Sequence, residues 1–238
     1  MSLPRRMEPE WLDQLPADDP RAMRSRRDLM RVNALMRNAH SMANALRKYG
    51  TDLRPQTLAD LGCGDGRFML GVARHLAPYW PNVTVFLLDR QNVVSSATRD
   101  AFAALRWRVE TICEDVFSFF SDVHSERVDV VTCNLFLHHL TELQLRRLLA
   151  VAAERASLFV ACEPRRAKFV VRISRLLWAV GCNDVSVHDA VASARAGFTD
   201  QELSALWPGG DQWQSHEYAA AMFTHCFAAR RPVPQREG

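Results

Sequence analysis

Three acidic residues and a run of glycines stand where a parallel sheet would bring them together. The segment Leu58–Phe68, with the sequence LADLGCGDGRF, places Asp60 two residues before Gly62 and adds Gly64 and Gly66. Such glycines let the backbone approach a ligand closely where a buried strand ends and a helix begins. A carboxylate at Asp60 repels a pyrophosphate but suits a ligand with an ammonium and a sulfonium. The segment therefore predicts a loop for a cationic ligand and argues against a nicotinamide dinucleotide.

Polar side chains also end the next three predicted strands. Asp89 follows the second strand, where its carboxylate can accept from both hydroxyls of a ribose. Asp115 follows the third strand and can accept from an adenine amino group, with Val116 as apolar cover. Asn134 ends the fourth strand, facing the same crevice. The alternative is a tight strand–helix turn with solvated acids, but four features in this order favour one binding crevice.

Two histidines and a glutamate are the candidate catalytic groups. His138 and His139 come just after the fourth strand, and Glu163 ends the fifth. A histidine can take the proton from an acceptor hydroxyl near neutral pH, and a neighbouring carboxylate fixes its tautomer. The alternatives are an architectural role for the histidine pair and a salt bridge from Glu163 to Arg165 or Arg166. The sequence does not decide which histidine faces the crevice.

The elements that position these residues follow from the hydrophobic pattern. Runs of β-branched and apolar residues alternate with helical patterns after residue 56, which is typical of βαβ units on a parallel sheet. Two runs near the C-terminus are too close for a crossover helix and predict an antiparallel hairpin. We expect strands at Thr57–Leu61, Asn82–Leu88, Arg106–Cys113, Val128–Asn134, Ser157–Cys162, Trp213–Ala219 and Met222–Ala229, and helices at Gly66–Ala77, Asn92–Ala104, Glu142–Arg155 and Arg165–Val180.

In these motifs and their order, residues 57–230 resemble the class I S-adenosylmethionine-dependent methyltransferases. The similar branch includes quinone-biosynthesis C-methyltransferases and natural-product O-methyltransferases. The resemblance implies an α/β fold with a Rossmann-like, doubly wound sheet in the order 3-2-1-4-5-7-6, the seventh strand antiparallel. It implies S-adenosylmethionine as cofactor and S-adenosylhomocysteine as product. It assigns the methionine loop to Asp60, Gly62 and Gly64, the ribose to Asp89, the adenine to Asp115 and Val116, and the methionine side to Asn134.

The N-terminal segment differs from the rest of the chain. Residues 21–48 hold eight basic residues and one acid, although the net charge of the chain is only +3. Apolar residues recur there at helical spacing, which predicts an amphipathic helix over residues 21–47. We expect residues 1–50 to form a helical lid over the cofactor, with Arg37 or His40 reaching the methionine carboxylate, and residues 51–238 to form the methyltransferase domain. The predicted stripe comprises Leu29, Val32, Met36, Ala39, Ala43 and Leu46.

The composition narrows the class of protein. A chain of 238 residues with 48% hydrophobic and 24% charged residues is globular. The most apolar stretch, Phe169–Val180, is interrupted by Arg172 and Arg175, which argues against a membrane span. The six cysteines are scattered, which is typical of reduced thiols in a cytoplasmic protein, and no histidine or cysteine spacing predicts a metal site.

The favoured function is methyl transfer to a small, phenolic or polyketide-like acceptor, with O-methylation preferred. This would be an activity of bacterial secondary metabolism. Two alternatives remain open: an RNA methyltransferase that uses the basic N-terminal helix, and a catalytically inactive protein that binds S-adenosylmethionine as a partner of another enzyme. Nucleic acid is disfavoured, since Asn134 is followed by Leu-Phe-Leu and not by two prolines and an aromatic residue. The sequence does not indicate an oligomeric state.

Overall fold

Seven strands form one mixed sheet in the computed structural model of the protein, which describes residues 3–16, 18–36, 38–121 and 127–232, with the backbone alone at 13 and 29–36. The strands are β1 (Thr57–Leu61), β2 (Thr84–Asp89), β3 (Arg108–Cys113), β4 (Val128–Asn134), β5 (Ala156–Pro164), β6 (Gln214–Ala219) and β7 (Thr224–Arg230). Their order is β3-β2-β1-β4-β5-β7-β6, and β7 is antiparallel to both of its neighbours. The predicted order and the terminal hairpin are confirmed.

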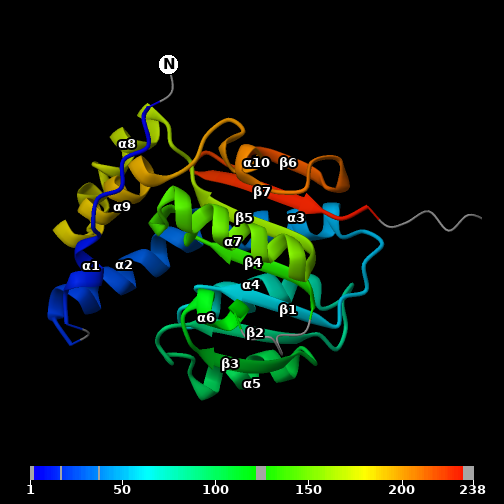
Figure 1. Cartoon of the computed structure of the whole chain (residues 1–238). Helices are drawn as coiled ribbons and strands as arrows, with labels where there is room; N and C mark the ends of the chain where they lie inside the picture. Colours follow the sequence, from blue (N-terminus) through cyan, green and yellow to red (C-terminus); the bar gives the residue numbers. More distant parts are fainter. Residues whose placement is uncertain (1–2, 17, 37, 122–126, 233–238) are drawn as a thin grey trace, which may run out of the picture.

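Helices cover both faces of this sheet and one of its ends (Figure 1). The α-helices are α1 (Trp11–Gln14), α2 (Pro20–Met36), α3 (Asn38–Tyr49), α4 (Arg67–Leu76), α5 (Ser96–Ala104), α6 (Val116–Ser121), α7 (Glu142–Arg155), α8 (Lys168–Ser174), α9 (Asp184–Ala196) and α10 (Glu202–Leu206). Short 3₁₀ turns are η1 (Leu137–His139), η2 (Leu177–Val180) and η3 (Gly210–Gln212).

The core consists of two apolar layers, one on each face of the sheet. Alternate residues of β5 enter opposite layers, as the two-residue period of a strand requires: Leu158 and Val160 face one side, Phe159 and Ala161 the other. The first layer lies under α3, α4 and α5, and the second under α6, α7 and α10. The start of α7 is fixed by a capping box between Thr141 and Gln144.

The largest differences from the prediction concern helices. The helix expected at Arg165–Val180 begins only at Lys168, because the extended chain of β5 continues to Pro164 and Arg165 bridges to Phe198, and it is divided into α8 and η2. The helix α9, which begins at an Asn183 cap and ends before Gly197, was not predicted. The short helix α6 was not predicted.

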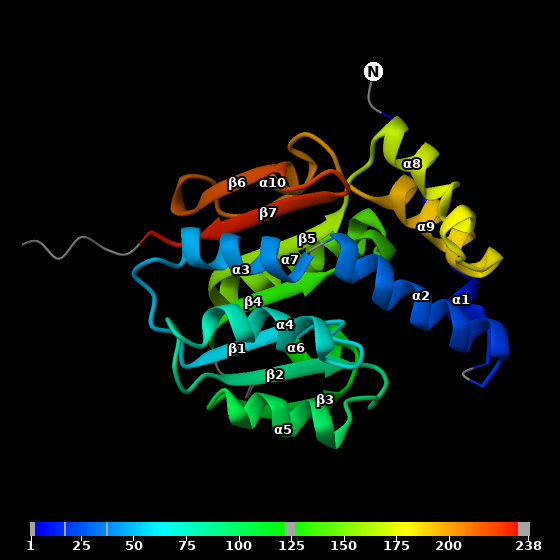
Figure 2. The ribbon, with the colours of Figure 1, turned by 180° about the vertical axis from the view of Figure 1, so that it is seen from behind.

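The N-terminal helices pack in two different places. Helix α3 belongs to the core, because Met42, Ala43 and Leu46 are fully buried against the same layer as α4. Helices α1 and α2, together with α8 and α9, lie beyond the carboxyl ends of the parallel strands (Figure 2). The division of the chain at residue 50 stays a prediction. Within the described residues, no helix is both long and apolar enough to cross a membrane.

The expected contact of His40 with a methionine carboxylate is not supported. The His40 ring packs edge-on against His75, with ring centroids 5.3 Å apart. His75 lies near the carboxyl end of α4, whereas the glycine loop precedes the first residue of that helix. Arg37 and the side chains of Leu29, Val32 and Met36 lie outside the described part of the chain.

Candidate active site

The glycine loop is a tight turn between β1 and α4. Gly62, Gly64 and Gly66 have φ angles of 69°, 55° and 74°, which residues with a β-carbon rarely adopt. A β-carbon on Gly62 would lie 2.4 Å from the Phe136 ring, so glycine is required there by packing as well as by conformation. A β-carbon on Gly64 would meet nothing within 4 Å, so the loop is open at that residue, at the end of the central strand.

Asp60 is buried at the foot of this loop, with a 2% exposed side chain. The Thr132 hydroxyl on the neighbouring strand β4 donates to Asp60 Oδ1 at 2.8 Å. Burial and the nearby charge of Asp89 raise the pKa of Asp60 to about 7, although the Thr132 hydrogen bond opposes the rise. A cation placed above the loop would stabilise the ionised carboxylate.

Asp89 ties the end of β2 to the glycine loop. Its Oδ2 accepts the Gly64 N–H at 2.9 Å, and its Oδ1 accepts the Gln91 N–H at 2.9 Å. A small hollow lies beside it, lined by Asp89, Cys63 and Ile112 among others. Each carboxylate oxygen keeps a second lone pair for a ligand hydroxyl.

Asp115 lies two residues beyond the end of β3, and Val116 is the first residue of α6. Asp115 accepts the Phe117 N–H at 2.8 Å and a paired contact from Arg90 Nε and Nη2 at 3.0 and 2.8 Å. Burial would raise the pKa of Asp115, but the Phe117 hydrogen bond and the Arg90 guanidinium outweigh it and hold the pKa below its usual range. Val116 is buried in the second apolar layer. Arg90, which the sequence analysis did not consider, thus occupies much of the Asp115 carboxylate.

His138 and Glu163 form a buried pair on the same edge. His138 Nδ1 lies 2.8 Å from Glu163 Oε2, and the Glu163 side chain is fully buried. Glu163 also accepts the backbone N–H groups of Phe136, Leu137 and His138 at 3.0, 2.9 and 3.3 Å. The carboxylate therefore fixes both the turn after β4 and the histidine ring. The alternative salt bridge from Glu163 to Arg165 or Arg166 is not formed.

The two adjacent histidines have different surroundings. His138 is 3% exposed, whereas His139 lies at the surface with its ring 4.0 Å from the His138 ring. The other ring nitrogen of His138, Nε2, lies 3.6 Å from Glu10 Oε1 and has no hydrogen-bond partner. Burial lowers the pKa of His138, but Glu10 and Glu163 outweigh it and raise the pKa to about 9. His138 is thus the histidine that a carboxylate orients.

Glu10 is a functional candidate that the sequence analysis missed. Burial raises the pKa of Glu10, but His138, His139 and the Ser193 hydroxyl outweigh it and lower the pKa below its usual value. Glu10, His138 and His139 bring potential ligand atoms within 4.8 Å of one another, the kind of cluster that can hold a metal ion. The sequence predicted no metal site, and that prediction stays untested.

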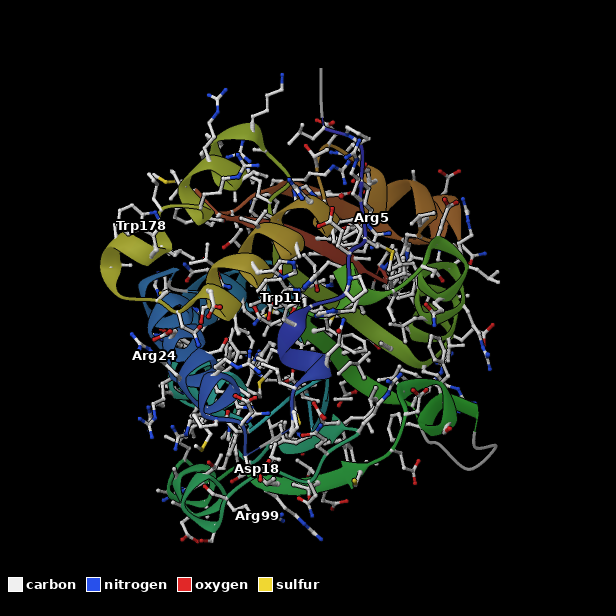
Figure 3. All side chains as sticks on the ribbon, turned by 90° about the vertical axis from the view of Figure 1, so that its left-hand side faces the viewer. Arg5, Trp11, Asp18, Arg24, Arg99 and Trp178 are labelled. Atoms are coloured by element: carbon white, nitrogen blue, oxygen red, sulfur yellow. The ribbon has the colours of Figure 1, made fainter. Side chains whose placement is uncertain are left out.

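A strap formed by residues 3–14 carries Glu10 to the site. Arg5 donates to the carbonyls of His138 and Leu140 at 3.2 and 3.0 Å and to Ala196 of α9 at 2.8 Å. The strap ends in α1, whose Trp11 lies over the edge of the sheet below Arg5 (Figure 3). It therefore covers the carboxyl ends of the central strands.

The His188–Asp189 pair of α9 anchors the strap. Asp189 accepts the N–H groups of Trp11 and Leu12 at 2.8 and 3.0 Å, and the Trp11 ring stacks on His188 at 3.9 Å. His188 Nδ1 also lies 2.9 Å from Asp189 Oδ1. Arg195, in the same helix α9, pairs with Glu8 at 3.1 Å. These side chains hold the strap in place and do not face His138.

Three buried polar atoms without a hydrogen-bond partner gather at this edge of the sheet. They are Asn134 Oδ1, His138 Nε2 and Asn38 Nδ2. Asn38 is linked through its Oδ1 to Thr224, which pairs with Pro164 at the end of β5. Buried polar groups are normally paired, so unpaired ones at a strand edge indicate a place for a ligand. With the open glycine loop and the acids, these atoms fit a cofactor that carries ammonium, carboxylate and hydroxyl groups.

A larger hollow lies at the opposite edge of the sheet. It has a volume of about 800 Å³ and is lined by Arg47, Lys48, Arg54 and residues 78–80, which precede β1 and β2. Ligands of open parallel sheets bind beyond the carboxyl ends of the strands, and none of the candidate site residues lines this hollow. We therefore place the site at the glycine loop despite the smaller cavity there.

Comparison with known proteins agrees with this placement. Residues 58–156 match the family model described as a methyltransferase domain, and these residues run from β1 to the end of α7. No curated protein sequence matches the chain. The fold resembles that of the plantazolicin methyltransferase BpumL in complex with S-adenosylhomocysteine, with 14% identity, a TM-score of 0.64, and coverage of 93% of this chain and 94% of that one.

Two further structures are larger proteins. The mitomycin 7-O-methyltransferase MmcR shares 21% identity with a TM-score of 0.61, and an O-methyltransferase family protein from Burkholderia thailandensis shares 19% with a TM-score of 0.56. They align with 93% and 92% of this chain but only 60% and 62% of their own length. Residues 58–156 thus match a methyltransferase domain, and the strand order and fold of the chain are shared with methyltransferases, one of them solved with S-adenosylhomocysteine.

Proposed function

We propose that the chain methylates a hydroxyl group of a small, apolar acceptor of phenolic or polyketide-like structure. The observation that carries this proposal is the buried His138, held by Glu163 at one ring nitrogen and without a hydrogen-bond partner at the other. An oxygen nucleophile has to lose a proton as it is methylated, and a nitrogen acceptor with this orientation is what that transfer requires. The shared fold with the mitomycin 7-O-methyltransferase MmcR supports methylation at oxygen.

The residues assigned to the cofactor each offer a matching group. S-adenosylmethionine supplies a methyl group on a positively charged sulfur. The open turn at Gly62 and Gly64, with the Asp60 carboxylate beneath it, suits the cationic methionine portion, and Asn134 offers an unpaired acceptor beside it. The Asp89 oxygens are the candidates for the ribose hydroxyls. Val116 and the carboxylate of Asp115 are the candidates for the adenine.

His138 and Glu163 then act on the acceptor. As the acceptor oxygen is methylated, its proton passes to Nε2 of a neutral His138, and the positive charge on the ring is stabilised by Glu163 at Nδ1. Glu163 keeps its place because three backbone N–H groups hold it. Glu10 lies where the acceptor hydroxyl would approach, so acceptor binding requires the strap to move from Nε2.

The experiment that tests the function is a comparison of acceptors under identical conditions. We expect transfer of a labelled methyl group to phenols with apolar substituents, no transfer to the corresponding O-protected compounds, and weak transfer to anilines. Transfer to an RNA mixture that exceeds transfer to every phenol would overturn the proposal in favour of the alternative with the basic N-terminal helix. Binding of S-adenosylmethionine without any transfer would favour the inactive partner protein.

Cofactor affinity is expected to depend on pH through Asp60. The pKa of Asp60 near 7 means that the carboxyl is protonated below that pH, and a bound cation favours its ionised form. Below about pH 7, binding of the cofactor therefore releases a proton from Asp60. The affinity for the cofactor rises between about pH 6 and about pH 8. Calorimetry in buffers of different ionisation enthalpy measures that proton directly. Asp60→Asn should remove the proton release, while Asp65→Asn, in the same loop, should keep it; an unchanged proton count in Asp60→Asn contradicts the assignment.

Glu10→Gln is expected to shift the pH profile of kcat/KM for the acceptor to lower pH, because kcat/KM reports the enzyme before the acceptor displaces Glu10. Glu10 and Glu163 both raise the pKa of His138 towards about 9, and the amide keeps the size of the side chain while removing one charge. In the acceptor-free variant, His138 should then be neutral, and able to accept a proton, at a lower pH than in the native chain. The kcat/KM near neutral pH should therefore rise. Glu8→Gln, on the same strap but paired with Arg195, is the matched control. A profile unmoved by Glu10→Gln would show that Glu10 does not control the proton acceptor.

A further inference from the structure

The segment of α8 and η2 presents apolar side chains to solvent on a protruding turn. Phe169 and Ile173 are 38% exposed, and Leu176, Trp178 and Val180 are 57%, 65% and 74% exposed. The opposite face of α8 is already used, because Val170 and Val171 are buried against Ala194 of α9. The exposed residues are therefore not needed for the fold. Figure 3 shows Trp178 at the margin of the molecule, well away from Trp11 and the strap.

Cations accompany these apolar side chains. Lys168, Arg172 and Arg175 are exposed, and none of them forms an ion pair within the described part of the chain. No acidic residue occurs between Pro164 and Asn183. Arg24 of α2 extends the basic surface, since its Nη2 donates to the carbonyl of Gly181 at 3.1 Å. Asp184, at the start of α9, is the first acid that follows.

We propose that this surface, formed by Lys168, Phe169, Arg172, Ile173, Arg175, Leu176, Trp178 and Val180, binds the face of an anionic phospholipid bilayer. Apolar tips next to tryptophan and basic side chains are the composition of segments that lie in the membrane interface. Trp178 fits the headgroup level, with Leu176 and Val180 reaching the acyl boundary. The three unpaired cations meet the negative lipid headgroups. This inference does not depend on which acceptor is methylated.

Two other occupants agree less well with the same residues. A second copy bound through this surface about a twofold axis would bring the basic surface against an identical basic surface that has no acids to pair with it. An RNA strand would neutralise the cations but would leave Leu176 and Val180 without an apolar partner, since only Phe169 and Trp178 have the aromatic rings that stack on bases. An anionic bilayer satisfies the charged and the apolar side chains together.

The test is binding of the full chain to vesicles of phosphatidylcholine alone and of phosphatidylcholine with about one third phosphatidylglycerol. We expect sedimentation with the anionic vesicles only, weakened by high salt. Arg172→Gln/Arg175→Gln should weaken partitioning about fivefold for each charge removed. Leu176→Ser/Val180→Ser should weaken it at least about tenfold, because the apolar anchor is lost. Lipids brominated on their acyl chains should quench part of the tryptophan fluorescence, and Trp178→Phe should remove that quenching while binding persists.

Matched variants on distant surfaces separate this surface from general effects. Arg54→Gln/Arg74→Gln removes the same charge, and Leu143→Ser/Val93→Ser removes exposed apolar residues elsewhere. Equal losses in these controls, or no binding to anionic vesicles, overturn the proposal. The proposal is also overturned if light scattering shows the native chain as a dimer and Leu176→Ser/Val180→Ser as a monomer, while vesicle binding is the same for both. If that variant fails to fold, the quenching difference of Trp178→Phe decides the question alone.

Discussion

Replacing His138 by alanine is expected to lower turnover by about 10²–10⁴-fold, the range for loss of a general base. The ring is the only group in the described site with a buried, unpaired nitrogen beside a fixed carboxylate. Affinity for S-adenosylmethionine should stay nearly unchanged, since no cofactor contact is assigned to His138. Single-turnover rates and calorimetry on the same preparation measure the two quantities.

His139→Ala is the matched control, because the two residues are neighbours on η1 and only His138 is buried. We expect it to have little effect on turnover. His138→Ala also leaves Glu163 with one partner fewer, so thermal unfolding of each variant has to be compared before the rates are. A loss below about tenfold with an intact fold would mean that positioning of the acceptor supplies the catalysis, because a phenol ionises near pH 10 without help. Both histidines would then be architectural.

The fold followed from sequence wherever the pattern was local and repeated. β1, β4 and α7 begin and end at the predicted residues. In each of them the apolar pattern is regular and its ends are marked by the sequence, as the Thr141 capping box marks the start of α7. The helix α9 was missed although it has its own boundary signals, an Asn183 cap and a Gly197 stop. The split between α8 and η2 had no such signal, since the apolar run continues through it.

Only those residues of the candidate site that lie at the end of a strand, or just after it, could be predicted from the sequence. Asp60, Asp89, Asn134, His138 and Glu163 share one edge because parallel strands end together. Glu10 could not be found this way, because its position depends on a strap held by α9 and by the carbonyls around η1. Before α1 the strap has no helix or strand, so hydrophobic periodicity does not predict its contacts. They depend on the tertiary fold.

The strap and His138 are linked through the charge of Glu10. While Glu10 lies beside Nε2, the pKa of His138 stays raised by two carboxylates, and the ring is protonated at neutral pH. An acceptor that displaces Glu10 removes one of those charges and lowers the pKa of His138. In the proposed function, the ring would therefore become a competent base at the moment when an acceptor hydroxyl takes the place of the carboxylate. This order would limit methyl loss to water when no acceptor is bound.

Asp89→Ala is expected to weaken binding of S-adenosylmethionine by about 1–3 kcal/mol, or roughly 5- to 150-fold, the range for leaving buried polar groups unpaired. Asp89 ends β2 and accepts the Gly64 N–H, so the change removes both the proposed ribose contact and one anchor of the glycine loop. Calorimetric titration with S-adenosylmethionine and with S-adenosylhomocysteine measures the loss. Similar losses for the two ligands are expected, because their ribose is identical.

Asp89→Asn separates the two roles of this side chain. The amide keeps one oxygen for the Gly64 N–H but places a donor where the other oxygen accepts the Gln91 N–H, so the anchor to the glycine loop survives while the paired acceptance of two ribose hydroxyls does not. We expect Asp89→Asn to unfold at nearly the native temperature and still to bind the cofactor at least about fivefold more weakly. Asp100→Ala, an exposed acid on α5, controls for the loss of negative charge. Native affinity in Asp89→Asn together with weak binding in Asp89→Ala would place the whole effect in the loop, and the ribose assignment would then be wrong.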